Sequence, residues 1–378
     1  MKRTFTLAAL AALLTFCLCA AGESMLAASG SHALYLDESG RVWAWGSNHR
    51  GESVPTDAAA WVSVPQQVFE GAKQIACGRQ FSCALGEDGT LWSWGGAHGE
   101  TPDTGSATAG APALLLKDVT QVSACEDACA CVLSDGRVAY LSGGEAAQYF
   151  GTDAVKTACG ANFMIWLDSA GDVYFIGNTD YLPSDAAAET PAKIASACAD
   201  IYADGQTGAL VLNSGEMRVF GASGSEGRLG IDTNEWIRSP AANGVKNVRA
   251  GVCGVSASGA IDADGAFYAW GTLYSYFTAF DERGEMYFSE SGGTLINYGK
   301  TPIKLYDGVK CAAFGEAFGV LELNDGTLLS WGSNEWGQLG NGFNTSFELI
   351  AGEDEDDYEI DVTENYQAVF PLQVKIPR

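Results

Sequence analysis

Short apolar segments separated by polar turns run through most of the chain, and residues 77–95 show the pattern clearly. Two apolar segments, "FSCAL" and "TLWSW", flank the turn "GEDG". Short apolar runs bounded by glycine and aspartate are typical of β-strands. An Asp-Gly pair between two such runs predicts a tight hairpin, because glycine adopts the positive φ that the turn requires. We therefore expect a hairpin that turns at Asp88-Gly89 and ends at Trp94-Gly95.

The spacing between the turn glycine and the tryptophan recurs along the sequence. It joins Gly40 to Trp45, Gly89 to Trp94, Gly265 to Trp270 and Gly326 to Trp331. In three further copies another residue replaces tryptophan: Gly136 precedes Leu141, Gly171 precedes Ile176 and Gly215 precedes Phe220. The seven copies follow one another at intervals of 35 to 61 residues. Because the repeat fixes their position, we interpret the tryptophans as blade-packing residues rather than as ligand-stacking ones.

A proline marks a second position in the repeat. Such prolines lie 24 or 25 residues before a turn glycine, at Pro65, Pro112, Pro191, Pro240 and Pro302. Each proline starts a short apolar segment and a second apolar segment follows it, so one repeat contains about four short strands. Four-stranded units that recur at this interval predict a β-propeller, because a single unit cannot bury both of its faces. The fold class that we expect is all-β, with seven four-stranded antiparallel blades.

The two ends of the chain hold complementary parts of one repeat. The segment that begins at Pro371 has the proline-led strand but no hairpin after it. The first hairpin, which turns at Gly40, has no proline-led strand before it. We therefore expect the N- and C-terminal segments to pair in one blade and close the ring, which removes open sheet edges. Residues 22–378 would then form a single propeller domain.

The first 21 residues differ from the repeats. Lys2 and Arg3 precede the uncharged run "TFTLAALAALLTFCLCAAG", which ends in small residues. This pattern is typical of a secretory signal peptide, so we expect residues 1–21 to be removed and the protein to be secreted or held at the cell surface. A lipoprotein site at Cys17 or Cys19 is the alternative, although a bulky residue precedes each cysteine. No later apolar run is long enough to span a membrane, so no membrane insertion is expected after cleavage.

The copies resemble the regulator of chromosome condensation repeat. The resemblance rests on "ACG…CALGEDGTLWSWG" in the second copy and on "SNEWGQLGNG" after the last tryptophan, and it extends over residues 24–378. It implies a seven-bladed propeller. Members of this family commonly carry a histidine eight residues before the turn glycine, and here His32 matches. The other copies depart from that pattern, with Phe81, Ala128, Phe163, Thr207, Ala257 and Phe318.

The formal net charge of −26 restricts the partners that can be expected. Without a basic patch, the protein has no favourable counterion release on binding nucleic acid, so no nucleic-acid partner is expected. The nucleotide exchange and chromatin contact of the family's founding member are therefore not transferred to this acidic, exported chain. Relatives of this repeat type also include a secreted bacterial β-lactamase inhibitory protein, which binds its enzyme with loop aromatics and fits the expected compartment.

Nine cysteines remain after removal of the signal peptide, and we expect them to be mainly free and structural. Cys77, Cys159 and Cys253 each lie twelve residues before a turn glycine. A small buried side chain at that position lets strands crowd toward the axis. Disulfides are the alternative in an exported protein, although an odd number of cysteines leaves at least one unpaired.

No metal, cofactor or catalytic site is predicted. The cluster of Cys125, Cys129 and Cys131 lacks the paired spacing and the histidine typical of zinc sites. The acidic run at 353–364 has no interior glycine and suits a solvated insertion better than a calcium loop. The three histidines have no motif-level partner for a hydrolytic triad. The glycine-rich segment at 221–230 follows a repeat position and is interpreted as a blade loop.

Aromatic residues outside the repeat positions are the candidate binding residues, because aromatics are enriched at protein interfaces. They are Trp236, Tyr274, Tyr276, Phe277, Tyr149, Tyr181 and Trp336. For each of them, packing within the local loop is the alternative.

Together these observations favour an exported, non-enzymatic and monomeric propeller that displays its loops to a protein partner whose identity the sequence does not give. The repeat accounts for most residues through structure, whereas the variable loops carry aromatics and acids. Two alternatives remain open. One is an extracellular enzyme inhibitor that resembles the β-lactamase inhibitory protein, and the other is a carbohydrate-binding protein.

Overall fold

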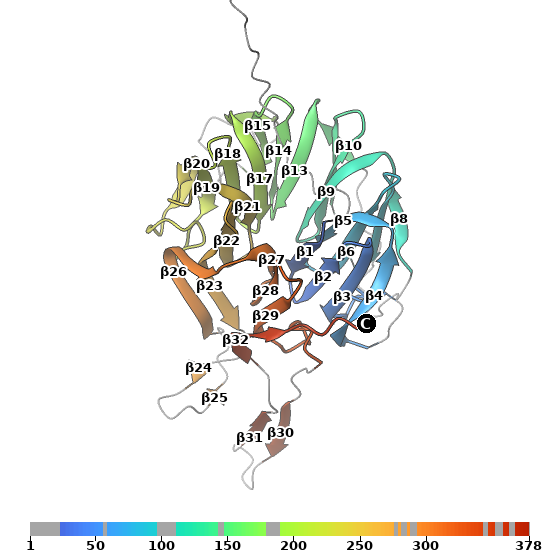
Figure 1. The fold of residues 1–378 in the computed structure, drawn as a ribbon, viewed down its shortest axis with the longest axis vertical. Coiled ribbons are helices and arrows are strands. Elements are labelled where there is room, and N and C mark those ends of the chain that lie inside the picture. Colours follow the sequence, from blue (N-terminus) through green and yellow to red (C-terminus); the bar gives the residue numbers. More distant parts are fainter. Residues whose placement is uncertain are drawn as a thin grey trace, which may run out of the picture.

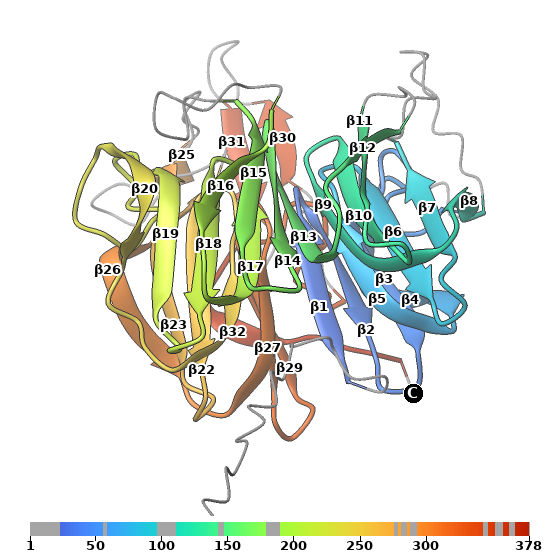
Figure 2. The ribbon, with the colours of Figure 1, turned by 90° about the horizontal axis from the view of Figure 1, so that it is seen from above.

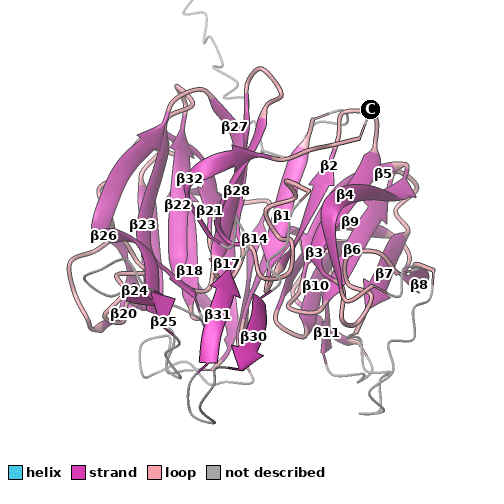
Figure 3. Ribbon diagram, turned by 90° about the horizontal axis from the view of Figure 1, so that it is seen from below, coloured by secondary structure: helices cyan, strands magenta, loops and turns pink. Residues whose placement is uncertain are grey.

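The computed structural model describes residues 23–55, 59–96, 111–142, 147–178, 190–275, 279–280, 286–287, 293–342, 347–351, 358–362 and 367–377. These residues form strands and loops, and no helix occurs among them (Figure 3). Seven four-stranded antiparallel sheets surround a common axis (Figure 1). This arrangement confirms the all-β, seven-bladed propeller that the repeat predicts. The expected signal peptide lies outside the described residues.

Each blade uses its four strands in chain order. Blade 1 consists of β1 (Met25–Ser29), β2 (His32–Leu36), β3 (Arg41–Ser47) and β4 (Trp61–Glu70). Blade 2 consists of β5 (Ala72–Cys77), β6 (Phe81–Gly86), β7 (Leu91–Gly95) and β8 (Ala113–Leu116). Blade 3 consists of β9 (Val119–Cys125), β10 (Ala128–Leu133), β11 (Val138–Ser142) and β12 (Gln148–Phe150). Blade 4 consists of β13 (Ala154–Gly160), β14 (Phe163–Asp168), β15 (Val173–Gly177) and β16 (Ala192–Ala195).

The remaining blades follow the same order. Blade 5 consists of β17 (Cys198–Asp204), β18 (Thr207–Leu212), β19 (Met217–Ala222) and β20 (Trp236–Ala242). Blade 6 consists of β21 (Val248–Val252), β22 (Ala257–Asp262), β23 (Phe267–Ser275) and β26 (Gly293–Tyr306). Blade 7 consists of β27 (Val309–Phe314), β28 (Phe318–Leu323), β29 (Leu328–Ser333) and β32 (Gln367–Gln373). Two short hairpins lie outside the blades: β24 (Ala279–Phe280) with β25 (Met286–Tyr287), and β30 (Phe347–Ala351) with β31 (Tyr358–Val362).

The first strand of each blade lies next to the axis (Figure 1), and the strands run between the two ends of the ring (Figure 2). The second strand is almost wholly buried. The proline-led segment is the fourth, outer strand of its blade. Pro65, for example, lies in β4, which pairs with β3 of the preceding hairpin. The sequence spacing predicts that this segment belongs to the same blade as the hairpin that follows it. In the structure it belongs to the blade of the hairpin that precedes it. The physical reason is that the chain returns along its own tryptophan-bearing strand and pairs there antiparallel.

The hairpin turns have the backbone conformation that the Asp-Gly signal predicts. All seven turn glycines have φ between 79° and 84°. In six of them the carbonyl oxygen also accepts a hydrogen bond from the first strand of the next blade, as Gly89 does from the Val119 N–H (2.9 Å). In blades 1 to 6 the turn therefore joins the blade to its successor.

The four repeat tryptophans are buried and link neighbouring blades. Each indole N–H donates a hydrogen bond across a blade boundary. In three cases the acceptor is a loop carbonyl of the preceding blade: Trp45 to Gln338 (2.9 Å), Trp94 to Ser53 (3.3 Å) and Trp270 to Arg228 (2.8 Å). Trp331 donates instead to the Tyr298 hydroxyl of blade 6. The tryptophans thus pack in the core and also hydrogen-bond neighbouring blades to each other.

The ring closes where blade 7 meets blade 1, so closure by the terminal segments is confirmed. The two terminal strands lie in neighbouring sheets rather than in one blade, because β32 pairs with β29 and β1 pairs with β2. Val374, just after β32, is buried in a cluster that also contains Trp45 and Leu26 of blade 1. Its N–H donates to the Leu328 carbonyl (3.0 Å). Side-chain packing, rather than a shared sheet, therefore joins the two ends.

A buried carboxylate reinforces this boundary. Glu322 of β28 is 2% exposed, at a position that is apolar in the other six blades. The Ser24 hydroxyl of blade 1 donates to it, and so does the Tyr35 hydroxyl (3.2 Å). Lys310 Nζ lies 3.7 Å from the same carboxylate. Burial and the nearby Glu322 raise the pKa of Tyr35, which keeps this hydroxyl protonated as a donor.

Candidate functional site

The two ends of the ring differ in what they present. We call the end that carries the Asp-Gly turns the turn end. We call the opposite end, where the third strands lead into their connecting loops, the loop end. Each first strand runs from the turn end to the loop end, because its last residue pairs next to the start of the second strand, as Ser29 does with His32.

Three aromatic side chains meet at the loop end, at the boundary of blades 7 and 1, and we call them the aromatic cluster. They are His49, Trp61 and Trp336. The His49 and Trp336 rings meet edge to face with 4.5 Å between centroids. The Trp61 and Trp336 rings are 6.2 Å apart and tilted by 49°. His49 is exposed and Trp61 is 41% exposed, so the cluster forms an open aromatic corner on the surface.

The loops that carry this cluster are held by hydrogen bonds. The Trp336 N–H donates to Gln338 Oε1 (2.7 Å), and the Leu339 N–H donates to Asn334 Oδ1 (3.0 Å). The carbonyl of Gln338 in turn accepts from the indole of Trp45. In the facing loop, Asn48 Oδ1 accepts from the Val54 N–H (2.8 Å). The aromatic cluster is therefore pre-organised, which limits the ordering cost of binding.

The structure places the other predicted binding aromatics on separate blades. Trp236, 42% exposed, starts β20 of blade 5 and lies at the loop end beside Ala222. Tyr274 lies in the loop-end extension of β23 of blade 6, where its backbone pairs with Thr294. Tyr149 of β12, in blade 3, is 49% exposed, and the Arg137 guanidinium lies 4.9 Å from its ring centroid.

Tyr181, Tyr276 and Phe277 lie outside the described residues. Among the predicted aromatics that the structure describes, Trp336 lies against two other aromatic rings, those of His49 and Trp61. Its neighbours Trp61 and His49 were missed by the sequence analysis. The signal that could have found them is ring closure, which makes the loops after the first and last repeat tryptophans neighbours in space.

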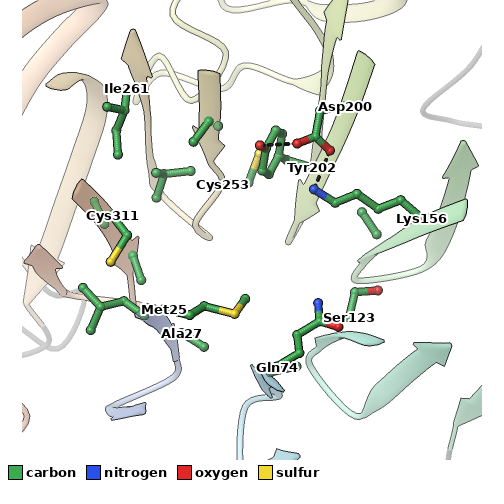
Figure 4. Close-up of a pocket in the computed structure, with 18 of the residues that line it drawn as sticks. Met25, Ala27, Gln74, Ser123, Lys156, Asp200, Tyr202, Cys253, Ile261 and Cys311 are labelled. Atoms are coloured by element: carbon green, nitrogen blue, oxygen red, sulfur yellow. Dashed lines mark hydrogen bonds and ion pairs between the residues drawn. The ribbon is translucent and has the colours of Figure 1, made fainter. Parts of the chain in front are cut away.

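A second candidate is a cavity of about 790 Å³ on the propeller axis, lined by the first strands of all seven blades (Figure 4). One wall is polar and comes from β5, β9, β13 and β17. Its labelled side chains are Gln74, Ser123, Lys156, Asp200 and Tyr202. The opposite wall comes from β1, β21 and β27 and is apolar apart from Arg249 and Lys310 near the starts of their strands. It includes Met25, Ala27, Ala250, Val252, Cys311 and Ala313.

The polar wall is organised by a buried ion pair. Lys156 Nζ pairs with Asp200 Oδ1, and the Lys156 and Asp200 side chains are 25% and 6% exposed. The Tyr202 hydroxyl donates to the other carboxylate oxygen (2.6 Å), and the Ile201 N–H donates to Oδ1 (2.7 Å). Lys156 Nζ also lies 4.3 Å from the centroid of the Tyr202 ring. These contacts fix the direction of the lysine into the cavity.

At the loop end the floor of the cavity contains a buried carboxylate. Asp204 accepts hydrogen bonds from the Cys125 thiol (3.0 Å) and the Gly205 N–H (2.7 Å). Burial, with the neighbouring Glu126 and Glu316 carboxylates, raises the pKa of Asp204 to about 7 despite these donors. This acid therefore titrates near neutral pH.

The nine described cysteines are free thiols, seven of them buried. Burial raises the pKa of Cys159 to about 12 and that of Cys198 to about 11, which makes both thiols poor nucleophiles. His32 is also buried, with Nε2 3.0 Å from the Ser82 hydroxyl, and burial lowers its pKa. Across the described ranges, no group of three or more His, Cys, Asp or Glu side chains is arranged to hold a metal ion.

The acidic run at 353–364 is only partly described. Residues 358–362 form strand β31, and the stretch 353–357 lies outside the described residues. The choice between a solvated insertion and a calcium site therefore stays a prediction from the sequence.

Comparisons with known proteins connect this ring to other propellers. The profile of the regulator of chromosome condensation (RCC1) repeat matches residues 26–52 and 72–97. The structure is similar to human WBSCR16, with a TM-score of 0.66, 18% identity, and coverage of 89% of this chain and 95% of that one. It is similar to Saccharomyces cerevisiae Prp20p, with a TM-score of 0.68, 17% identity, and coverage of 90% and 87%.

A third similar structure is the ectodomain of the Physcomitrella patens receptor kinase CR4, with a TM-score of 0.51, 14% identity, and coverage of 87% of this chain and 76% of that one. At these identities the likeness concerns the fold. No curated protein matches the sequence. Within the described part of the chain, no helix has the length and apolar character needed to cross a membrane.

Proposed function

We propose that this propeller, in which residues 26–52 and 72–97 match the regulator of chromosome condensation repeat, is an exported, monomeric and non-enzymatic scaffold that binds a protein partner. The observation that carries the proposal is the exposed aromatic cluster on pre-organised loops at the loop end. Prp20p, which shares the fold, is described as binding Gsp1p and histones. A ring of this type can therefore serve as a protein-binding platform.

The geometry of the aromatic cluster suits a side chain that inserts into it. Trp61 and Trp336 are tilted by 49°, so they form a corner rather than a flat surface. Tryptophans that can be desolvated on binding dominate the energy of many protein interfaces. A corner of this kind also favours an inserted side chain over a flat sugar ring, which supports protein binding over the carbohydrate alternative.

The charge around the loop end indicates which partners fit. The protein carries a net charge of −26, and the acids Glu335 and Glu235 directly precede Trp336 and Trp236 in the sequence. An arginine or lysine placed over a tryptophan face gains a cation–π contact, and the acidic field speeds the approach of a basic surface. The partner that we propose is therefore a protein with a basic patch at its contact surface.

Replacing both Trp61 and Trp336 with alanine is expected to weaken partner binding by at least about 100-fold, the effect of losing two interface hot spots. The wild-type chain and variants are immobilised, the partner is captured from the producing organism's surroundings and identified by mass spectrometry, and its affinity is measured by calorimetry. Tyr149→Ala is the matched control, because Tyr149 is similarly exposed but lies on blade 3 away from the cluster.

Equal affinity of the wild type and the double variant would place the interface elsewhere and contradict the proposal. If the captured partner is an enzyme that the propeller inhibits, the function narrows to the inhibitor class. If a glycan array gives specific, cluster-dependent binding while no protein is captured, the carbohydrate alternative replaces the proposal.

Export is proposed from the signal-like N-terminus, and the CR4 receptor ectodomain gives an example of a similar fold outside cells. The expected result is a product that leaves the cytoplasm and starts between Ala21 and Glu23, as found by N-terminal sequencing. Lys2→Glu with Arg3→Glu should leave the chain unprocessed. An intact Met1 on wild-type protein would contradict export through this segment.

A further inference from the structure

The axial cavity is closed at the loop end by contacts between blades. The Arg79 N–H donates to the Glu126 carbonyl (2.8 Å), and the Ala161 N–H donates to the Gly205 carbonyl (2.6 Å). The Glu316 N–H donates to the Gly30 carbonyl (2.8 Å), across the boundary of the last and first blades. The Arg79 guanidinium also lies 3.6 Å from the Glu126 carboxylate. A ligand would therefore enter from the turn end, on the face opposite the aromatic cluster.

A repeated backbone irregularity shapes this entrance. Six of the seven first strands carry a β-bulge at the same repeat position, one residue before Gln74 and its counterparts. Bulges of this kind redirect a side chain and often lie beside functional sites. The bulged residues all line the cavity, and they are Lys73, Thr120, Val155, Ala199, Arg249 and Lys310.

Half of these bulged residues are cations, in a chain that has only 21 lysines and arginines against 47 acids. The Lys310 ammonium group forms ion pairs with the carboxylates of Glu38 and Glu322. Arg249 uses one nitrogen on the carbonyls of Val309 (2.6 Å) and Lys310 (2.9 Å) and pairs with no carboxylate in the described chain.

Lys73 makes no hydrogen bond or ion pair within the described part of the chain, although the exposed Asp88 carboxylate attracts it at longer range. It lies on the same wall as Lys156. The two acids of this wall accept hydrogen bonds from protein groups, Asp204 from the Cys125 thiol and the Gly205 N–H. Both oxygens of Asp200 accept hydrogen bonds from protein groups. Glu23 and Asp264, which line the entrance, are exposed to water, so they compete only weakly for the cations.

Lys156 places a cation deeper in the cavity, and its pairing with Asp200 leaves further ammonium N–H donors. Across the axis, the apolar wall offers no charged partner of comparable depth, since Met25, Ala250 and Ala313 face the space there. Pockets of this size with one apolar wall and a few directed polar groups are typical of small-molecule sites.

We propose that the axial cavity binds a small organic acid, with its carboxylate at Lys73 and Lys156 and its apolar body against the wall of Met25, Ala250 and Ala313. The two lysines favour a negatively charged group, and the opposite wall favours an apolar chain attached to it. This site lies on the other end of the ring from the proposed protein-binding surface, so either can fail without the other.

Calorimetry with sodium octanoate tests the proposal, with octylamine as the probe of opposite charge. Wild-type protein is expected to bind one octanoate per chain and to bind octylamine at least tenfold more weakly. Lys73→Met should weaken octanoate binding by about tenfold, the effect of losing one charge-assisted contact. Lys193→Met is the matched control, because Lys193 lies on β16, the outer strand of blade 4, where it pairs with Asp172. It should leave octanoate binding unchanged.

Two further measurements locate the bound acid. Ala250→Phe fills the cavity without changing charge and should abolish octanoate binding while the thermal midpoint stays near that of wild type. Bound octanoate should also slow the alkylation of Cys311, a half-buried thiol on the apolar wall. The proposal is overturned by a lack of saturable octanoate binding up to about 10 mM. Preference for octylamine, or octanoate binding that Lys73→Met and Ala250→Phe leave intact, would overturn it equally.

Discussion

Deleting residues 371–378 is expected to open the ring and lower the free energy of unfolding by about 4–5 kcal/mol. The deletion removes half of β32 and the buried Val374, whose burial contributes about 1.5–3 kcal/mol. It also removes the hydrogen bonds from the Val374 N–H to Leu328 and from the Lys375 N–H to Gly340, each worth about 1 kcal/mol. The exposed edge of β29 then adds a further cost. Denaturant unfolding followed by tryptophan fluorescence measures the loss.

Shorter changes in the same segment separate closure from simple shortening. Removing only Pro377 and Arg378 should leave stability within about 0.5 kcal/mol, because Pro377 is exposed. Val374→Ala should cost about 1–3 kcal/mol. If the full deletion unfolds at the wild-type denaturant concentration and with the wild-type slope, the segment does not close the ring.

Glu322→Leu examines the same boundary at constant chain length. The six other blades carry an apolar residue at this position, so the leucine itself has precedent in the fold. It leaves the hydroxyls of Ser24 and Tyr35 without their acceptor, which should cost about 1–3 kcal/mol. Adding Ser24→Ala and Tyr35→Phe should recover most of that loss, since both hydroxyl donors are then removed. Of the other groups at Glu322, Lys310 keeps its pairing with Glu38, and the Cys311 thiol is only a weak donor. Failure to recover would mean that Glu322 acts through something other than these bonds.

The fold could be predicted because its signals are local. An Asp-Gly turn needs glycine in the left-handed region, and the structure holds each turn glycine there. The tryptophan at fixed spacing is buried against the neighbouring blade, and its indole N–H donates a hydrogen bond there, as Trp45 does to Gln338. The turn glycine recurs in all seven copies and the tryptophan in four, so a single sequence already carries several examples of each constraint.

The assignment of strands to blades does not follow from the sequence, because spacing along the chain does not say which neighbour a strand pairs with. The segment at Pro65 is as close in sequence to the next hairpin as to the preceding one, and the hydrogen bonds decide for the preceding one. The same ambiguity put the two terminal segments into one blade in the sequence analysis. They lie in neighbouring blades, and the core cluster around Trp45 and Val374 joins them.

The candidate sites depended on contacts that the sequence does not display. Trp336 was recognisable as an aromatic outside the repeat, but its contact with Trp61 arises only when the last blade meets the first. The axial cavity is lined by residues from seven strands, and the bulges that aim Lys73 and Arg249 into it carry no sequence mark of their own. Local patterns thus predict the scaffold, whereas the sites form from residues distant in sequence.

Asp204→Asn is expected to change how stability depends on pH. Burial first, and then the neighbouring Glu126 and Glu316, raises the pKa of Asp204 to about 7 in the folded protein, against about 3.9 in the unfolded chain. Between these values the folded state binds more protons than the unfolded state, so the free energy of unfolding falls as the pH rises. The contribution is fully present below about pH 4 and is lost above about pH 7.

Asparagine keeps an acceptor for the Cys125 thiol and the Gly205 N–H but carries no charge at any of these pH values. The stability of Asp204→Asn relative to wild type should therefore rise by about 2–4 kcal/mol between pH 4 and pH 8. Asp135→Asn is the control. Asp135 is exposed, and hydrogen bonds from the Arg137 backbone and side chain lower its pKa, so its difference curve should stay flat across that range and change only at lower pH. A flat curve for Asp204→Asn as well would mean that Asp204 is already ionised in the acidic range, and that the floor of the axial cavity carries a full negative charge at neutral pH.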